Sequence, residues 1–389
     1  MGQIVGAYAT VHAPQIFVRP PTEVPEQLDA DVAAMELIGR DLDELKPDAV
    51  IVIGSDHLET FFLSSVPTFA VIAGETSKAH FANKSYNMRM HLPLAEDILD
   101  KLVQAEFDMA YSQDALLGHS FAAVYEWIIA HRDIPVVPIF LNTYLPPLPT
   151  PQRCFKLGKE IARIVAGRAE RVAIIASGGM SHYPGTWKYP QPAYDFDYWA
   201  IAQLERGNID ELMKLSSEQL DEVGNTEMLP WYVLFGALGK TAGELITYQP
   251  TWHHGHAVMR FLPDKRKGPP KGEIPPAYVF KQGGFEFYKH PHPSAYNLNR
   301  ILYELRLSSD LRRRFFKSPT AVAKEFGCND KEAELMRTVL DENIDALRSL
   351  KPHPLVDAGA HALGMLMSLV VVQAEMRRLR AAGELEIGV

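Results

Sequence analysis

The sequence predicts an α/β region with a mostly buried sheet flanked by helices, followed by a small all-α C-terminal region. Two observations support this prediction. Five apolar runs rich in β-branched residues alternate with helix-like segments before residue 262, a pattern typical of βαβ units. After residue 294 no strand-like run occurs, and the apolar residues have helical spacing.

The expected strands can be placed by their apolar runs. The run Val50-Ile51-Val52-Ile53 has no polar alternation, which indicates a strand covered on both faces, as in a parallel sheet. Helix-like patterns over 24–45 and 149–167 have the length of crossover helices. The expected strands are 3–11, 49–55, 68–74, 134–142 and 171–179.

A change of composition predicts the domain boundary. The segment "LPDKRKGPPKGEIPP" is rich in Pro, Gly and Lys and has the character of a connector. We therefore expect a catalytic domain over 1–270, a linker over 271–293 and a helical domain over 294–389. Ser318 before Pro319 predicts one helix start, Asn329 or Asp330 caps a helix over 331–350, and the last helix covers 362–382.

Composition excludes several classes of protein. The net charge is −9 and the basic residues form no dominant stripe, which argues against nucleic-acid binding. Two cysteines, Cys154 and Cys328, cannot make a disulfide framework or a cysteine-rich metal site. The longest apolar run, 363–372, is too short to cross a bilayer. We expect a soluble cytoplasmic protein with no membrane partner.

Three histidines follow expected strands. His12 comes after the first run, His57 after the second, and His182 after the run that ends in "ASGGM". Ligands of open α/β sheets bind outside the carboxyl ends of the strands. One histidine there would be ordinary, but three favour a functional site.

A carboxylate would complete an oxygen-activating iron site of two histidines and one carboxylate, which leaves iron positions open. The best candidate is Glu227 in "VGNTEMLPWYVLFGALG", at the start of an apolar helix-like segment. The alternative is a glutamate that stabilises a helix N-terminus through the helix dipole. Spacing alone leaves both interpretations open, and favours the second.

Taken together, the motifs "TVHAP", "IVIGSDH", "ASGGMSH" and "NTEMLPW" resemble the class III extradiol ring-cleavage dioxygenases, the family of protocatechuate 4,5-dioxygenase β subunits. The resemblance implies that His12, His57 and Glu227 hold Fe(II) and that His182 is the catalytic acid–base beside it. The segment "AYNLNRILYELRLSSDLRRRF" is similar to the α subunit of the same enzyme. A β-like domain fused to an α-like domain is the arrangement of gallate dioxygenase.

One segment departs from the family pattern. The family has Asp-His-Gly where this chain reads "DALLGHSF", so the family histidine falls on Leu117 and His119 lies two residues later. Either His119 takes over the role, or the contacts to the substrate have changed. The cluster "TWHHGHAVM" offers further candidates, and we expect substrate binding by His119, His254 and His256, with His253 undecided.

The resemblance implies an Fe(II)-dependent extradiol dioxygenase. It inserts both atoms of O₂ beside the diol of a catechol- or gallate-like ring, and it works as a homodimer. Three alternatives remain at this stage. They are a zinc or manganese hydrolase with the same ligands, a non-catalytic binding protein on the same fold, and a serine hydrolase with Ser120 of "GHSFA" as nucleophile.

Overall fold

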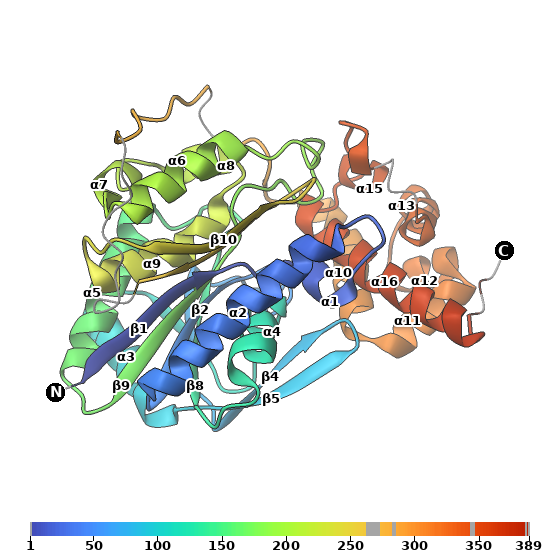
Figure 1. Ribbon diagram of the computed structural model, residues 1–389. Helices are drawn as coiled ribbons and strands as arrows, with labels where there is room; N and C mark the ends of the chain where they lie inside the picture. Colours follow the sequence, from blue (N-terminus) through green and yellow to red (C-terminus); the bar gives the residue numbers. More distant parts are fainter. Residues whose placement is uncertain (1, 262–272, 282–284, 343–346, 386, 388–389) are drawn as a thin grey trace.

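An eight-stranded mixed sheet forms the centre of the N-terminal two thirds of the chain (Figure 1). The structure is a computed structural model, and it describes residues 2–261, 273–281, 285–342, 347–385 and 387. The strand order is β10-β11-β1-β9-β2-β8-β3-β6, and the four central strands β1, β9, β2 and β8 run parallel. The strands are β1 (Gln3–Thr10), β2 (Ala49–Ser55), β3 (Phe69–Ile72), β6 (Met109–Ser112), β8 (Val136–Leu141), β9 (Arg171–Ser177), β10 (Glu244–Pro250) and β11 (Gly255–Arg260).

All five expected strands are present, and the sequence did not predict β6, β10 and β11 of the large sheet. A second sheet has the order β5-β4-β7 and contains β4 (Thr76–Phe81), β5 (Lys84–Arg89) and β7 (Leu116–Leu117). The sequence of β4, "TSKAHF", alternates between exposed and buried positions instead of forming an apolar run. Strand β6 lies at the edge of the large sheet, and its residues are partly exposed. Apolar runs therefore identified five strands of the large sheet, but they missed the edge strands β6 and β10 and the buried strand β11.

Helices cover both faces of the large sheet. They are α1 (Gln15–Val18), α2 (Pro25–Leu45), α3 (Leu92–Gln104), α4 (His119–Val124), a π-helical turn (Tyr125–Ile129), α5 (Pro151–Ala166), α6 (Tyr194–Glu205), α7 (Ile209–Leu212), α8 (Ser217–Glu222), a 3-10 turn (Thr226–Met228) and α9 (Leu229–Leu238). Residues of α3, α5 and α9 share one core cluster with one face of the sheet, and α2 and α4 belong to the cluster on the other face.

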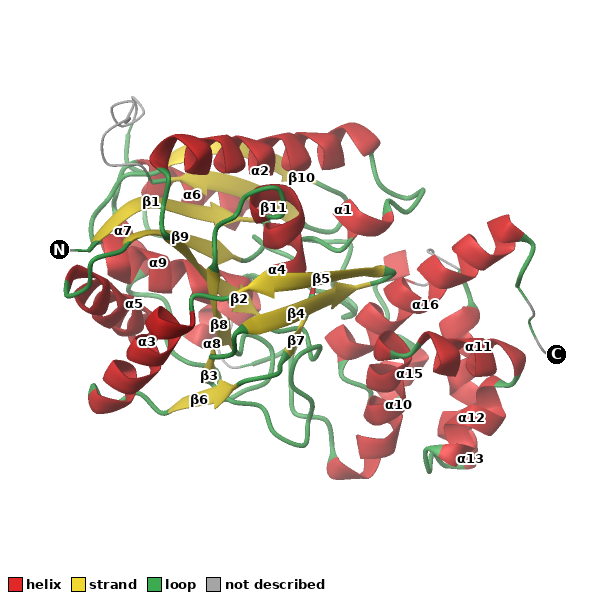
Figure 2. Cartoon of the chain, turned by 90° about the horizontal axis from the view of Figure 1, so that it is seen from below, coloured by secondary structure: helices red, strands yellow, loops and turns green. Residues whose placement is uncertain are grey.

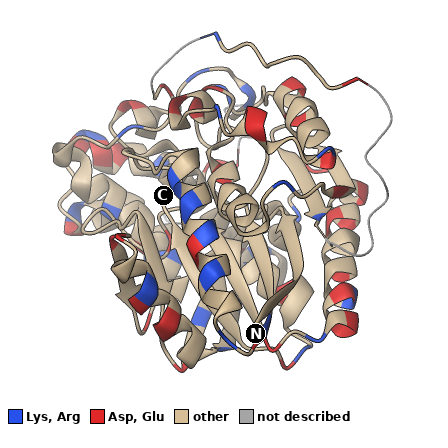
Figure 3. Cartoon of the chain, turned by 90° about the vertical axis from the view of Figure 1, so that its left-hand side faces the viewer, with Lys and Arg blue, Asp and Glu red and all other residues tan. Residues whose placement is uncertain are grey.

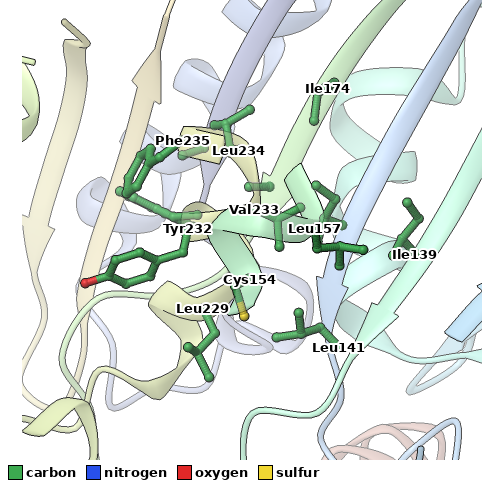
Figure 4. Close-up of a cluster of buried hydrophobic side chains, with 14 of the residues drawn as sticks. Ile139, Leu141, Cys154, Leu157, Ile174, Leu229, Tyr232, Val233, Leu234 and Phe235 are labelled. Carbon is green, nitrogen blue, oxygen red and sulfur yellow. The ribbon is translucent and has the colours of Figure 1, made fainter. Parts of the chain in front are cut away.

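Helices α5 and α9 cross at close range against the sheet. Figure 4 shows Cys154 and Leu157 of α5 among apolar side chains of α9, β8 and β9. A Cβ on Gly158 would lie 1.8 Å from the carbonyl oxygen of Val233, and one on Gly236 would lie 1.9 Å from that of Phe155. The two glycines therefore permit a backbone approach that any side chain would prevent.

The C-terminal helices gather on one side of the sheet, near the hairpin of β4 and β5 (Figure 2). They are a 3-10 turn (Pro293–Ala295), α10 (Tyr296–Leu307), α11 (Ser309–Lys317), α12 (Pro319–Glu325), α13 (Asp330–Leu335), a 3-10 turn (Met336–Leu340), α15 (Pro354–Asp357) and α16 (Ala362–Ala382). These helices have a core cluster of their own, but Leu363, Met367 and Val371 of α16 belong to a core cluster of the sheet region. Helix α16 therefore packs against both parts of the chain.

The predicted helix starts are correct, but one predicted helix is too long. Ser318 is the N-cap residue of α12, although its side chain makes no capping hydrogen bond, and Asn329 forms a capping box with Glu332 at the start of α13. The helix expected over 331–350 ends as α-helix at Leu335 and continues as a 3-10 turn to Leu340. Residues 343–346 and residues 262–272 of the expected connector lie outside the described residues. The division at 270 and 294 stays a prediction.

The surface carries charges of both signs. Figure 3 shows Lys and Arg mixed with Asp and Glu along the helices of one side. Among the described helices, including α16, none is both long enough and apolar enough to cross a membrane.

Candidate metal and active site

Four parallel strands deliver polar side chains to one edge of the sheet. His12 follows β1, His57 follows β2, Tyr144 follows β8 and His182 follows β9. Glu227 joins them from the 3-10 turn that precedes α9. All five side chains are buried.

The donor atoms of three of these side chains converge. His57 Nε2 lies 2.5 Å from Glu227 Oε1, and His12 Nε2 lies 3.2 Å from Glu227 Oε2. The two Nε2 atoms of His12 and His57 are 3.3 Å apart. A proton can bridge only two of these three groups, whereas a metal cation can be bound by His12, His57 and Glu227 together.

The protonation of His12 suits a metal ligand. The Ser177 hydroxyl donates to the carbonyl oxygen of Ser120 at 2.7 Å, so its oxygen accepts the Nδ1–H of His12 at 2.9 Å. This bond leaves the lone pair on Nε2, toward Glu227. Burial lowers the pKa of His12, and burial lowers that of His57 to about 3, which keeps both imidazoles neutral.

Glu227 is held as a carboxylate. Burial alone raises its pKa, but the contacts with His12, His182 and His57 outweigh burial and hold the pKa well below its usual range. Oε2 accepts from the Gly179 backbone N–H at 2.6 Å, and Oε1 accepts from the Tyr144 hydroxyl at 2.7 Å. Two neutral imidazoles and one carboxylate are a donor set that fits a divalent metal ion such as iron.

His119 also reaches this cluster. Its ring lies 4.1 Å from that of His57 and 5.2 Å from that of His12, and a ligand atom of each of the three lies within 4.8 Å of the others. Nδ1 of His119 is 2.7 Å from Glu59 Oε2. Burial raises the pKa of Glu59, but the interaction with His119 outweighs burial and lowers this pKa to about 2. The structure therefore places His119, and not residue 117, beside His12 and His57, and these three histidines are a group that could hold a metal ion.

The stacked rings of His182 and His254 form the next part of the site. Their centroids are 3.7 Å apart and their planes differ by 9°. The Nδ1–H of His182 donates to the Met180 carbonyl oxygen at 2.9 Å, so the lone pair of the neutral ring is on Nε2, 3.1 Å from the Tyr144 hydroxyl oxygen. His182 thus presents a proton acceptor to the centre of the site.

The other two histidines of the cluster "TWHHGHAVM" differ in their positions. His253 lines the pocket and lies 3.3 Å from Glu23 Oε1. His256 is fully buried, with Nδ1 at 2.6 Å from Asp31 Oδ2, and its ring packs edge-on against that of His254. The pocket wall among the described residues includes His254 but not His256, so the structure does not support substrate contact by His256.

Ser120 and Asp56 have structural partners. The Ser120 hydroxyl donates to the carbonyl oxygen of Ser55 at 2.6 Å, from within α4. A nucleophilic serine would instead have its hydroxyl toward a base. Asp56 accepts the backbone N–H groups of Glu59 and Thr60 and so caps a turn, and burial raises its pKa to about 6.

Sequence reasoning missed Tyr144, which contacts both Glu227 and His182. The signal was available, because Tyr144 follows the apolar run 134–142 as His12 and His57 follow theirs. The rule that polar residues after parallel strands meet at one edge applies to any side chain, not only to histidine.

The C-terminal helix α16 closes the pocket over these residues. The lining comprises His12, Ala13, Pro14, Gln15, His57, His119, His182, Pro184, Tyr189, Glu227, His253, His254, Leu363, Leu366, Met367 and Val370. The last four belong to α16. The helical region therefore contributes an apolar wall to the site of its own chain.

Arg306 of α10 holds the loop that carries His57. Its guanidinium donates to the carbonyl oxygen of His57 at 2.9 Å and to that of Leu58. Leu58 has φ of 54°, a left-handed conformation that is unfavourable for a leucine. The side chain of Arg306 is buried, and its pKa is lowered by that burial.

Replacing Arg306 by methionine is expected to lower the free energy of unfolding by about 3 kcal/mol, because two buried carbonyls lose charged donors. Urea denaturation of the metal-free protein measures this change. The matched control is Arg313→Met, since Arg313 is half-exposed and its ion pair with Glu384 is long, at 3.8 Å. Equal stability of the two variants would contradict the role of Arg306.

A comparison with known protein families identifies the class of protein as a ring-opening dioxygenase. Residues 6–260 match the family described as the catalytic LigB subunit of aromatic ring-opening dioxygenase, and the chain belongs to this family.

Among curated proteins, the chain is 30% identical over 175 residues to 2,3-dihydroxyphenylpropionate/2,3-dihydroxicinnamic acid 1,2-dioxygenase of Klebsiella pneumoniae strain 342. It is 31% identical over 176 residues to the protein of the same name of Escherichia coli K12 strain DH10B. Each match covers 44% of this chain and 55% of the relative, so the chain spans about half the length of these curated relatives. A solved structure, of the uncharacterized protein JW3007 from Escherichia coli K12, covers 66% of this chain and 99% of that chain, with 16% identity and a TM-score of 0.48.

Proposed function

We propose that this protein is an Fe(II)-dependent extradiol dioxygenase that opens a catechol- or gallate-like ring next to its diol. The observation that carries the proposal is the convergence of His12, His57 and Glu227 at the carboxyl edge of a LigB-family sheet. Relatives named as 1,2-dioxygenases of dihydroxyphenyl compounds support the same class of substrate. Both atoms of O₂ enter the ring-opened product, a muconic semialdehyde type of compound.

The chain supplies a site that binds the metal and moves protons. His12, His57 and Glu227 would hold the iron, which when bound supplies chelation of the diol oxygens and activation of O₂. His182 Nε2 accepts a proton from the diol and later returns it, because its Nδ1–H is committed to Met180. The stacked ring of His254 keeps His182 oriented.

Tyr144 and His119 complete the proposed roles. The Tyr144 hydroxyl orients Glu227 through Oε1 and lies within hydrogen-bond distance of His182. Burial and the nearby Glu227 raise the pKa of Tyr144, so it stays a donor. His119, oriented by Glu59, contributes a polar group to the substrate side of the pocket.

The test is anaerobic loading of the purified protein with iron, followed by metal analysis and oxygen uptake on a panel of diols. We expect stoichiometric iron, oxygen uptake and a yellow ring-opened product. Bound zinc or manganese with hydrolysis and no oxygen uptake would overturn the proposal in favour of a metal-dependent hydrolase.

Tyr144→Phe is expected to weaken iron binding about 10-fold, because residues that orient a metal ligand typically contribute that much to affinity. Competition with a chelator measures the change. Tyr288→Phe is the control, since Tyr288 packs on Tyr144 at 4.8 Å but donates to Pro184 instead of Glu227. The role assigned to Tyr144 fails if both variants bind iron equally well.

We further propose a homodimer in the cytoplasm, with residues 294–389 as an α-subunit-like domain. The similarity of 295–315 to that subunit and the two free cysteines support this proposal. Light scattering of the purified protein tests the dimer.

A further inference from the structure

The pocket at the metal ligands is too small for an aromatic ring as it stands. Its free volume is about 20 Å³, which is room for roughly one water molecule. Sites for small molecules usually enclose about 300–1,000 Å³. A ring that reaches His182 must therefore displace part of the wall.

A second cavity of about 510 Å³ adjoins the first, between α16 and the segment 15–23. Four residues line both spaces and so separate them, namely Gln15, Tyr189, Leu366 and Val370. The hydrogen bond between Gln15 and Tyr189 is 3.5 Å long, beyond the roughly 2.7–3.2 Å of an ordinary N–H···O bond, and is therefore weak. This wall consists of side chains, which rotate more readily than backbone shifts.

The outer cavity is apolar and its charged residues are mostly acidic. Its apolar lining includes Val18, Pro20, Pro21, Trp252, Leu347 and Leu369. Arg377 on its wall is paired with Glu342 at 3.3 Å, and Glu23 accepts from the Trp252 ring N–H at 2.9 Å. Asp341 adds a further acid. This lining disfavours a carboxylate and suits an uncharged apolar group.

We propose that the outer cavity receives an extended, uncharged apolar substituent of the diol substrate, while the diol itself passes Gln15, Tyr189, Leu366 and Val370 to reach the metal ligands. The inference rests on the proposed function. It narrows the substrate class to catechols with a bulky neutral substituent.

The test compares kcat/KM for catechol, 3-phenylcatechol and 2,3-dihydroxyphenylpropionate. The wild type is expected to favour 3-phenylcatechol over both others by about 10-fold or more, from added apolar contact. Pro21→Trp and Val18→Trp fill the outer cavity from two elements, and each should remove most of that preference. Val24→Trp is the control, because Val24 is 51% exposed and lies outside the cavity lining.

A binding measurement keeps this inference separate from the proposed function. Trp252 lines the cavity, so 3-phenylcatechol should quench tryptophan fluorescence of the iron-free protein more than catechol does, and Trp252→Phe should lose the difference. Quenching without oxygen uptake on any diol would refute the dioxygenase but support the cavity as a ligand site. Equal quenching by both diols, an unchanged preference in the filled variants or a preference for the propionate would overturn the inference.

Discussion

Replacing His57 by alanine is expected to abolish iron binding and oxygen uptake together. His57 Nε2 lies 2.5 Å from Glu227 and 3.3 Å from His12 Nε2, so its loss removes one of three donors that converge on one point. We expect less than stoichiometric iron and a fall in oxygen uptake on the order of 10³-fold or more. Metal analysis and an oxygen electrode measure both quantities on the same preparation.

The control for this variant is His131→Ala, because His131 is exposed on the surface. It should keep full iron content and full activity. Added imidazole should restore part of the activity of His57→Ala, since the substitution leaves a cavity of about the size of the lost ring. Stoichiometric iron in His57→Ala, with activity retained, would refute the ligand role of His57.

Replacing His182 by glutamine is expected to lower kcat by about 10²–10⁴-fold while iron content stays unchanged. His182 Nε2 lies 3.5 Å from Glu227 Oε1, farther than the Nε2 atoms of His12 and His57 lie from this carboxylate. Glutamine keeps a polar side chain at this position, but it does not accept a proton as imidazole does. Steady-state kinetics and metal analysis together separate proton transfer from metal binding.

His131→Gln is the matched control for this substitution and should change neither quantity. A His182→Gln variant that lost its iron would move His182 from proton transfer to metal binding. A variant with wild-type kcat would remove His182 from the reaction altogether.

The buried half of the fold could be predicted from sequence because burial on both faces produces uninterrupted apolar runs. The runs that became β1, β2, β8 and β9 also located the edge where His12, His57 and His182 lie. Strand β4 alternates between exposed and buried residues and β6 consists of partly exposed ones, so their sequences contain no apolar run and resemble loops. Glu227 lies on a short turn far along the chain, so spacing alone gave it no more weight than an ordinary helix-terminal glutamate.

The contacts that refine the site could not be predicted, because they join segments distant in sequence. Arg306 reaches the carbonyl oxygen of His57 across 249 residues, and no local pattern marks such a pair. His256 faces Asp31 and not the pocket, and no local pattern distinguishes it from His253 and His254, which line the pocket. Tyr144 could have been predicted, because it follows an expected strand as His12 and His57 do.

Helix α16, which forms one wall of the pocket, is synthesised after the other residues that line it. The proposed metal ligands lie at residues 12, 57 and 227, whereas the residues that cover them lie at 363–370. Chains fold from the N-terminal part during synthesis, so the ligands assemble while their cover is still missing. Helix α16 is therefore the last described part of the pocket wall to be made, and the pocket has its apolar wall only once this helix has packed against the sheet region.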